Sequence, residues 1–362
     1  MRLNMHKLKN KFKRLFMSAA TIGTACLLAG CGAGAAAGTD NSSVTESQSG
    51  VNGSEQENAS SDSQKLQIVA TIFPEYDWVK EILGDQADNV DLTLLLGNGT
   101  DMHSFQPTME DVLKVSTCDL FIYVGGESDS WVADALKGAG NPDRKAINLM
   151  DVLGDQVKEE EIVEGMQDED GHTHEEEHTH DDDLEYDEHV WTSLRNASVI
   201  CGIIAETLEE MDPENKDVYA SNAAAYQEKL SDLDTEYQNT VDSAKQNTLL
   251  FADRFAFRYL VDDYGLNYYA AFSGCSAESE ASFKTVTFLA EKLDELGLKT
   301  VLTIEKSDDR IAQTVIENTK TKDQKILELN SMQSITSDEI ADGVTYLSVI
   351  EDNLDVLKEA LN

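Results

Sequence analysis

Short apolar runs rich in β-branched residues alternate with amphipathic stretches from residue 66 to the end of the chain. The runs have the length of strands, and the stretches between them repeat apolar residues every three or four positions, as helices do. Strands that alternate with helices predict parallel sheets and an α/β fold. The strands are predicted at residues 66–73, 89–96, 119–126, 145–152, 248–252, 267–272, 299–305 and 325–329.

Two amphipathic segments, residues 190–212 and 213–245, separate the two groups of strands. The second begins at Pro213, contains no glycine and is mostly polar, which predicts one long helix crossing between two α/β lobes. A coiled coil is the alternative, although the apolar stripe is thin for one. We therefore expect an N-terminal lobe at 65–212, a linking helix at 213–245 and a C-terminal lobe at 246–362.

The start of the chain has the pattern of a lipoprotein leader. Residues 1–15 carry six Lys or Arg and no acids, and the apolar run that follows is too short to span a membrane. Leu28-Ala29-Gly30-Cys31 resembles the bacterial lipobox, in which Cys31 becomes the lipidated first residue after removal of 1–30; an ordinary leader is the alternative. Residues 31–64 contain almost no large apolar residue, which predicts a flexible tether. The mature protein is thus expected outside the cytoplasm, anchored to the cell membrane.

The charge of the chain favours cations as ligands. The formal net charge is −41, and removal of the basic leader takes it to −47. A nucleic-acid partner is excluded, since its phosphates would be repelled. The three cysteines beyond the leader and Cys31 form no CxxC pair, and we expect Cys118, Cys201 and Cys275 to pack as small apolar residues.

Five of the seven histidines lie in the acidic stretch 168–193, within an insertion at 159–188 and directly after it. Imidazoles among carboxylates predict a divalent metal. His189 stands at the start of the helix after the insertion. His103, in a glycine-containing loop after a strand, is expected to project into a cleft. The remaining four form the run HTHEEEHTH, expected to be an accessory metal-collecting loop: His172, His174, His178 and His180.

Enzymatic alternatives find little support in the histidine pattern. The HTHEEEHTH run lacks the histidine that a metallohydrolase motif would place after the acids, and no nucleotide-binding glycine motif, GxSxG elbow or Ser/His/Asp set is present. A solvated acidic loop without a metal role remains an alternative for the run. We predict a binding protein and not an enzyme.

Four features of the chain resemble the metal-binding solute receptors of bacterial ABC importers, in the zinc/manganese class. They are GTDMHSFQPT, DEHVWTS, the acidic His-rich insertion immediately before it, and the closing TYLSVIEDNLDVLKEAL. The resemblance covers Leu66 to Asn362. It implies two (β/α) lobes with parallel sheets joined by one long rigid helix, a metal cleft between the lobes, and an ABC transporter permease as partner. We expect the receptor to be a monomer.

The resemblance places the first two metal ligands on His103 and His189. The third family position falls on Arg254 and the fourth near Asn330, and a guanidinium has no lone pair for a metal. Substitute ligands from the C-terminal lobe are therefore needed, and Arg254 is expected to pair with an acid on this lobe. The acids considered are Asp253, Glu278, Glu280 and Glu305, of which Asp253, Glu278 and Glu305 are the candidate ligands.

The predicted function is an extracytoplasmic receptor that captures Zn²⁺ and delivers it to a membrane permease. Histidine ligands and the His-rich loop favour Zn²⁺ over Mn²⁺, which stays possible. Two alternatives remain: a surface lipoprotein for cell adhesion with a structural metal, and a zinc-dependent hydrolase of the cell wall.

Overall fold

The computed structural model describes residues 65–138, 140–167, 185–276 and 280–362. The predicted leader, the tether and Cys31 lie outside the described residues, as do Glu278 and the four histidines of the HTHEEEHTH run.

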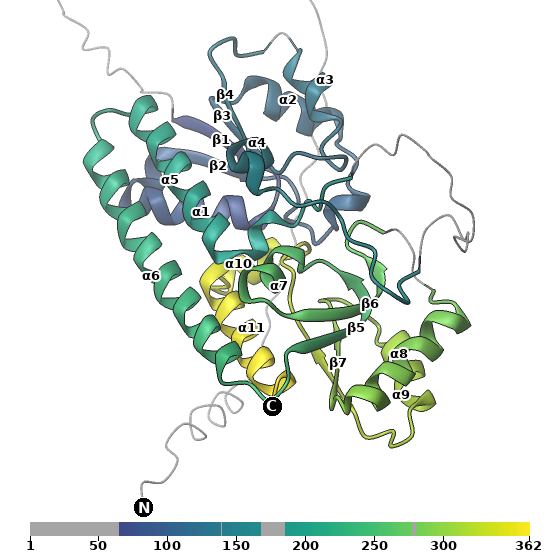
Figure 1. Ribbon diagram of the computed structural model, residues 1–362. Coiled ribbons are helices and arrows are strands. Elements are labelled where there is room, and N and C mark those ends of the chain that lie inside the picture. The colour runs from purple at the N-terminus through teal and green to yellow at the C-terminus, as the bar shows by residue number, and fades with distance from the viewer. Residues whose placement is uncertain (1–64, 139, 168–184, 277–279) are drawn as a thin grey trace, which may run out of the picture. The chain divides into compact units, whose positions relative to one another are not determined.

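The described chain forms two parallel four-stranded sheets with the same strand order (Figure 1). In the N-terminal lobe the order is β2-β1-β3-β4, and in the C-terminal lobe it is β6-β5-β7-β8. Every pairing between strands is parallel. The strands are β1 (Leu66–Ala70), β2 (Val90–Leu94), β3 (Leu120–Tyr123), β4 (Lys145–Asn148), β5 (Thr248–Phe255), β6 (Asn267–Ser273), β7 (Thr300–Thr303) and β8 (Lys325–Glu328).

Helices cover both faces of each sheet, which explains why the strands are apolar runs without a polar face. The helices of the N-terminal lobe are α1 (Phe73–Leu83), α2 (Met109–Thr117), α3 (Val132–Leu136), α4 (Leu149–Leu153) and α5 (Leu194–Met211). The long helix α6 (Lys216–Asp242) follows. The helices after it are α7 (Arg258–Tyr264), α8 (Phe283–Leu296), α9 (Arg310–Asn318), α10 (Ser337–Ala341) and α11 (Tyr346–Ala360).

The alternation of side chains along each central strand divides the core. In β3, Leu120 and Ile122 pack in the large cluster that contains side chains of α1 and α5, while Phe121 packs with α2 and α3. In β5, Leu249 and Phe251 belong to the same large cluster, and the intervening Leu250 packs with α8 and α9. Successive residues of a strand point to opposite faces, so each sheet is buried on both sides.

Helix α6 packs against elements from both lobes. Figure 1 shows it running beside α5 and α11, and it also contacts α1 and α7. Its Asn222 amide donates to the Ile82 carbonyl of α1 (3.0 Å), and its Tyr237 hydroxyl donates to the Ile350 carbonyl of α11 (2.7 Å). A helix of this length is about 40 Å long, and its bonds at both ends connect the two lobes through a rigid element.

Direct hydrogen bonds also join the lobes near the predicted cleft. The Trp191 indole donates to the Ser331 carbonyl (2.7 Å), and the Tyr346 hydroxyl donates to the Trp191 carbonyl (2.7 Å). The Tyr346 amide donates to a carboxylate oxygen of Asp77 in α1 (2.8 Å). All of these partners are buried, so the segment around Trp191 is held from both sides.

The observed elements differ from the predicted ones mainly at boundaries. The strand predicted to continue through residue 152 ends at Asn148, whose side chain accepts from the Asp151 amide and caps α4. The short helix α10 was not predicted. In the part of the chain that the structure describes, no helix is both long and apolar enough to cross a membrane.

Candidate metal centre

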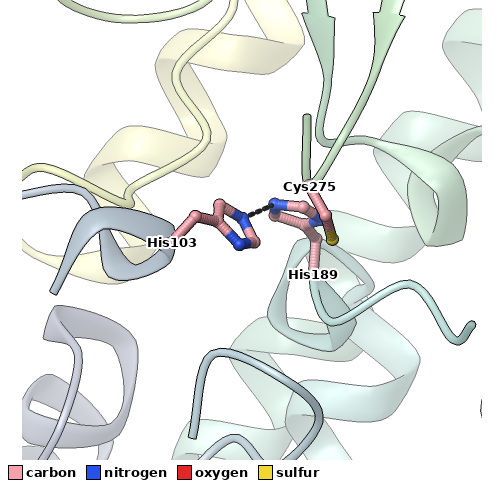
Figure 2. A group of neighbouring side chains, drawn as sticks. All are labelled: His103, His189 and Cys275. Carbon is pink, nitrogen blue, oxygen red and sulfur yellow. Dashed lines mark hydrogen bonds between the residues drawn. The ribbon is translucent and has the colours of Figure 1, made fainter. Parts of the chain in front are cut away.

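Three side chains from separate segments meet between the lobes: His103, His189 and Cys275 (Figure 2). His103 lies in a 3₁₀ turn (Met102–Ser104) after β2, His189 directly precedes a second one (Val190–Thr192), and Cys275 lies in the loop after β6. One ligand atom from each lies within 4.8 Å of the other two. Figure 2 shows the two imidazole rings pointing at each other, with the cysteine beside His189.

The backbone and ring of His103 are both held. Asp101 caps the 3₁₀ turn by accepting from the His103 amide (3.0 Å). The ring Nδ1 lies 2.9 Å from Ser128 Oγ, and the Ser128 amide in turn donates to Glu188 (2.9 Å). These contacts leave Nε2 directed at His189, so His103 offers that nitrogen to a ligand.

His189 is fully buried and is oriented by Asp187. One Asp187 oxygen accepts from the His189 amide (2.9 Å) and lies 3.0 Å from the ring Nδ1. The Asp187 carbonyl accepts from the Tyr259 hydroxyl of α7 (2.7 Å), so the C-terminal lobe supports this segment too. A carboxylate on Nδ1 keeps the proton there and leaves Nε2 for a metal, as in many metal sites.

The two imidazoles differ in how readily they take up a proton. Burial and the neighbouring His189 lower the pKa of His103 to about 3. Burial also opposes charge on His189, but Asp187 outweighs it and raises the pKa of His189 above its usual value. The two Nε2 atoms lie 3.1 Å apart. At this distance one ring can donate an Nε2–H to the other, and a cation can replace the proton between them.

The distances fit a tetrahedral zinc site. Two nitrogens bound to one tetrahedral Zn²⁺ lie about 3.4 Å apart, and the observed separation is 3.1 Å. Little movement of either ring is needed to admit the ion.

Of the other candidate ligands, the two that the structure describes, Asp253 and Glu305, do not belong to this cluster. Glu305 is 7 % exposed, and its oxygens accept from the amide and hydroxyl of Ser331 and the amide of Gln333 (2.7, 2.8 and 3.0 Å). Its carboxylate thus holds the following loop. Asp253 accepts from the Arg254 amide (2.9 Å) and lines a cavity of about 480 Å³ beside the site.

The two C-terminal family positions are engaged elsewhere. The Asn330 side chain accepts from the Met332 amide within its own loop (2.8 Å). Arg254 was expected to pair with an acid of its own lobe, but its guanidinium pairs with Asp101 of the N-terminal lobe. The reason is tertiary, because closure of the lobes brings the end of β5 to the turn that carries His103.

Cys275 is the site residue that sequence reasoning missed. Cys118 and Cys201 pack as buried apolar residues, as expected, whereas Cys275 is half-buried beside the imidazoles. Its neighbour Gly274 allows this approach: a Cβ there would lie 2.8 Å from His189 Cε1 and 2.7 Å from the Phe255 carbonyl oxygen. A glycine directly before a cysteine in a strand-end loop was the available signal.

The stem of the His-rich insertion bonds to the C-terminal lobe near Cys275. A Glu160 carboxylate oxygen accepts from the Cys275 amide (3.2 Å), and the Gln167 amide donates to the Ala271 carbonyl (2.9 Å). Gln167 also accepts from the Ser282 amide (2.7 Å). The last described residue before the histidines is therefore fixed to the segment that leads into the Cys275 loop.

The family model of the zinc-uptake complex component A, periplasmic (ZnuA), matches residues 68–360. The chain belongs to this family. This membership confirms the resemblance found in the motifs. It also agrees with the prediction that the protein is a binding protein and not an enzyme. Among relatives, this ZnuA-family chain is 33% identical over 299 residues to the zinc-binding lipoprotein AdcA of Streptococcus pneumoniae, with 82% of the chain and 56% of the relative covered. It is 30% identical to the high-affinity zinc uptake system protein ZnuA of Bacillus subtilis, covering 86% and 92%.

Solved structures confirm the predicted two-lobe α/β fold. The Zn(II)-bound ZnuA-like domain of S. pneumoniae AdcA superposes with a TM-score of 0.63 at 28% identity, covering 82% of this chain and 99% of that one. The metal-dependent lipoprotein YcdH of B. subtilis gives 0.64 at 26%, covering 82% and 99%. The laminin-binding protein Lmb of Streptococcus agalactiae superposes with a TM-score of 0.64 at 24% identity, covering 82% of this chain and 100% of that one. At this identity the likeness shows the fold alone. The ZnuA-family chain spans about half the length, 56%, of the AdcA relatives it matches.

Proposed function

We propose that this protein is the extracytoplasmic receptor of a zinc-importing ABC transporter, with His103 and His189 as ligands of the cargo ion. The observation that carries the proposal is the pair of buried Nε2 atoms 3.1 Å apart, each ring backed at Nδ1 by a polar group. Neutral imidazoles at this spacing suit Zn²⁺ better than Mn²⁺, which prefers oxygen ligands. The Zn(II)-bound AdcA domain at 28% identity supports the same cargo.

Delivery requires a permease and an ATPase as partners. A loaded receptor docks on a membrane permease, and a separate ATPase supplies the energy for transport. The receptor acts as a monomer, anchored through lipid on Cys31. Replacement of Cys31 by alanine should move the protein from the membrane fraction to the medium, and an unchanged membrane fraction would refute the anchor.

The His-rich run acts as an accessory collector. Its support is the stem, because Gln167 and Glu160, which precede the run in the sequence, bond to the segment around Cys275. Four alanine replacements, at His172, His174, His178 and His180, avoid altering the length of the loop. Zinc titration of this variant should retain one tight equivalent and lose weaker ones. Unchanged stoichiometry would show that the loop is inert.

The central test is zinc titration of the mature protein and of the His103→Ala, His189→Ala double variant, by calorimetry or chelator competition. The double variant should lose the tight equivalent, since both nitrogens are gone. The four-alanine loop variant is the matched control, because it removes more histidines but leaves the cleft intact. A double variant that binds one tight zinc as well as the wild type would refute the cleft.

A further inference from the structure

The C-terminal lobe lacks a donor at both family positions, although the N-terminal lobe supplies two imidazoles. Arg254 has no lone pair and is paired with Asp101. Asn330 uses its amide oxygen for the Met332 backbone, and Glu305 is saturated by its own loop. Among the described residues, one other C-terminal side chain has a metal-binding atom next to the imidazoles, and it is Cys275.

The position of Cys275 mirrors that of His103. The sheets share one strand order, so β6 occupies in its sheet the edge place that β2 occupies in the other. His103 lies in the loop that follows β2, and Cys275 lies in the loop that follows β6. Because loops after the carboxyl ends of parallel strands gather at one edge of a sheet, the two equivalent loops face each other across the lobes.

The loop around Cys275 is fixed in this position. Glu160 accepts from the Cys275 amide (3.2 Å), and Gly274 packs so closely on the His189 ring that no side chain fits there. Burial, and then the acidic groups Glu160, Asp187 and Glu188, raise the pKa of the Cys275 thiol. Their negative charge favours a cation at the sulfur.

We propose that the Cys275 thiolate is the third, C-terminal ligand of the cargo ion, which makes the site His₂Cys. This inference rests on the proposed function of His103 and His189. On binding, the thiol releases its proton to solvent and the sulfur forms a bond to the ion. Tetrahedral zinc with Zn–S near 2.3 Å has N–S separations of about 3.6 Å, so the observed cluster needs to contract by roughly an ångström at most.

A thiolate donor changes the selectivity of the receptor. Sulfur favours soft and borderline cations, so the site takes Zn²⁺, Co²⁺ and Cd²⁺ in preference to Mn²⁺. Three protein donors leave a fourth position to water, as in open zinc sites.

Cobalt substitution tests the proposal, because Co²⁺ bound to a thiolate gives an intense near-ultraviolet charge-transfer band. The proteins compared are the mature wild type, Cys275→Ser and Cys118→Ser, each checked for folding by thermal unfolding without metal. Cys118 is the matched control because it is buried away from the site and bonds only to the Val115 carbonyl (3.2 Å), which serine can also do.

We expect the band in the wild type and in Cys118→Ser, and its loss in Cys275→Ser. The zinc affinity of Cys275→Ser should fall on the order of 100-fold. Loss of a residue that only supports a ligand lowers metal affinity by about 10–100-fold, and loss of a ligand should cost at least the upper value. A band that persists in Cys275→Ser, or is absent from the wild type, overturns the thiolate ligand.

The His103→Ala and His189→Ala variants separate this failure from failure of the proposed function. If the two histidine variants lose cobalt binding and the wild type itself shows no thiolate band, the cleft holds metal without Cys275. If they bind cobalt like the wild type, the receptor site itself is refuted.

Discussion

The guanidinium of Arg254, at the end of β5, pairs with Asp101, whose other carboxylate oxygen caps the turn that carries His103. The two side chains are 20 % and 21 % exposed. Burial disfavours charge on Asp101, but the Arg254 charge overcomes it and lowers the pKa of Asp101. At the position where the resemblance places a third ligand, this chain has a cation that joins the lobes and pairs with the residue capping the His103 turn.

The pair should therefore stabilise the closed arrangement. In a double-mutant cycle of Arg254→Met and Asp101→Asn, where asparagine keeps the cap, we expect a coupling of about 1–3 kcal/mol, between the values for exposed and buried pairs. Urea unfolding measures it. The Lys145–Glu210 pair is the control, and its coupling should be much smaller because both side chains are exposed. Equal couplings would contradict an inter-lobe role for Arg254.

Asp187 should matter for metal affinity although it does not touch the ion. Asp187→Asn still accepts from the His189 amide but loses the charge that orients the ring. Loss of such a partner lowers metal affinity about 10–100-fold. Chelator competition measures the change, with the exposed Asp134→Asn as control. An Asp187→Asn variant with wild-type affinity would show that packing alone orients His189.

Zinc affinity should fall with acidification, and the fall should steepen as His189 becomes protonated. Metal binding requires neutral imidazoles. Because the pKa of His189 is raised above 6.5, protonation of this ring competes from above that pH and contributes about a tenfold drop in affinity per pH unit below the pKa. His103 stays neutral until the pH approaches about 3 and adds no competition. Calorimetry across this pH range measures the change in zinc affinity. An affinity that stays unchanged down to pH 5 would contradict the prediction.

Glu75 should make the protein less stable as the pH rises. Burial, and then repulsion by Asp129, raise the pKa of Glu75 from 4.5 to about 8. Between these values the folded state keeps a proton that the unfolded chain has released, so the free energy of unfolding falls by about 1.4 kcal/mol per pH unit. Below pH 4.5 both states are protonated and the effect vanishes.

Glu75→Gln should flatten this slope. Its amide oxygen can accept from Thr71 and Ile72 as Glu75 Oε2 does, while the other oxygen has no partner to lose. Denaturant unfolding from pH 5 to pH 8 measures the slope. Asp129→Asn should flatten it over a narrower window, because the pKa of Asp129 is raised by burial to about 7. A slope identical to wild type in both variants would disprove this account.

Gly274→Ala should damage the site more than the fold. The added methyl carbon would meet His189 Cε1 and the Phe255 carbonyl oxygen within 3 Å, so the loop must move away from the ring. We expect weaker zinc binding and loss of the cobalt–thiolate band. Gly202→Ala, inside α5, is the control, because its added methyl would meet the Gln227 side chain at 3.3 Å and should leave metal binding unchanged. Retention of the band in Gly274→Ala would mean that the loop adjusts freely.

The sequence by itself determined the class of fold, and it singled out two of the three side chains that meet between the lobes. Apolar runs of strand length alternating with amphipathic helices are local signals, and burial on both faces leaves few arrangements other than parallel sheets. His103 and His189 were recognisable because each stands in a short motif after a strand or before a helix. Boundaries such as Asn148 were missed because one side-chain cap ended the strand.

Only the tertiary structure decided the C-terminal half. Asp253 and Glu305 have the chemistry of ligands, but the donors around Glu305 come from residues 331–333, which a local pattern does not reveal. Arg254 meets Asp101, and Cys275 meets the imidazoles, because the packing of the two lobes brings their strand-end loops together. Which side chains face each other across that gap depends on lobe packing, and so on contacts far apart in the chain.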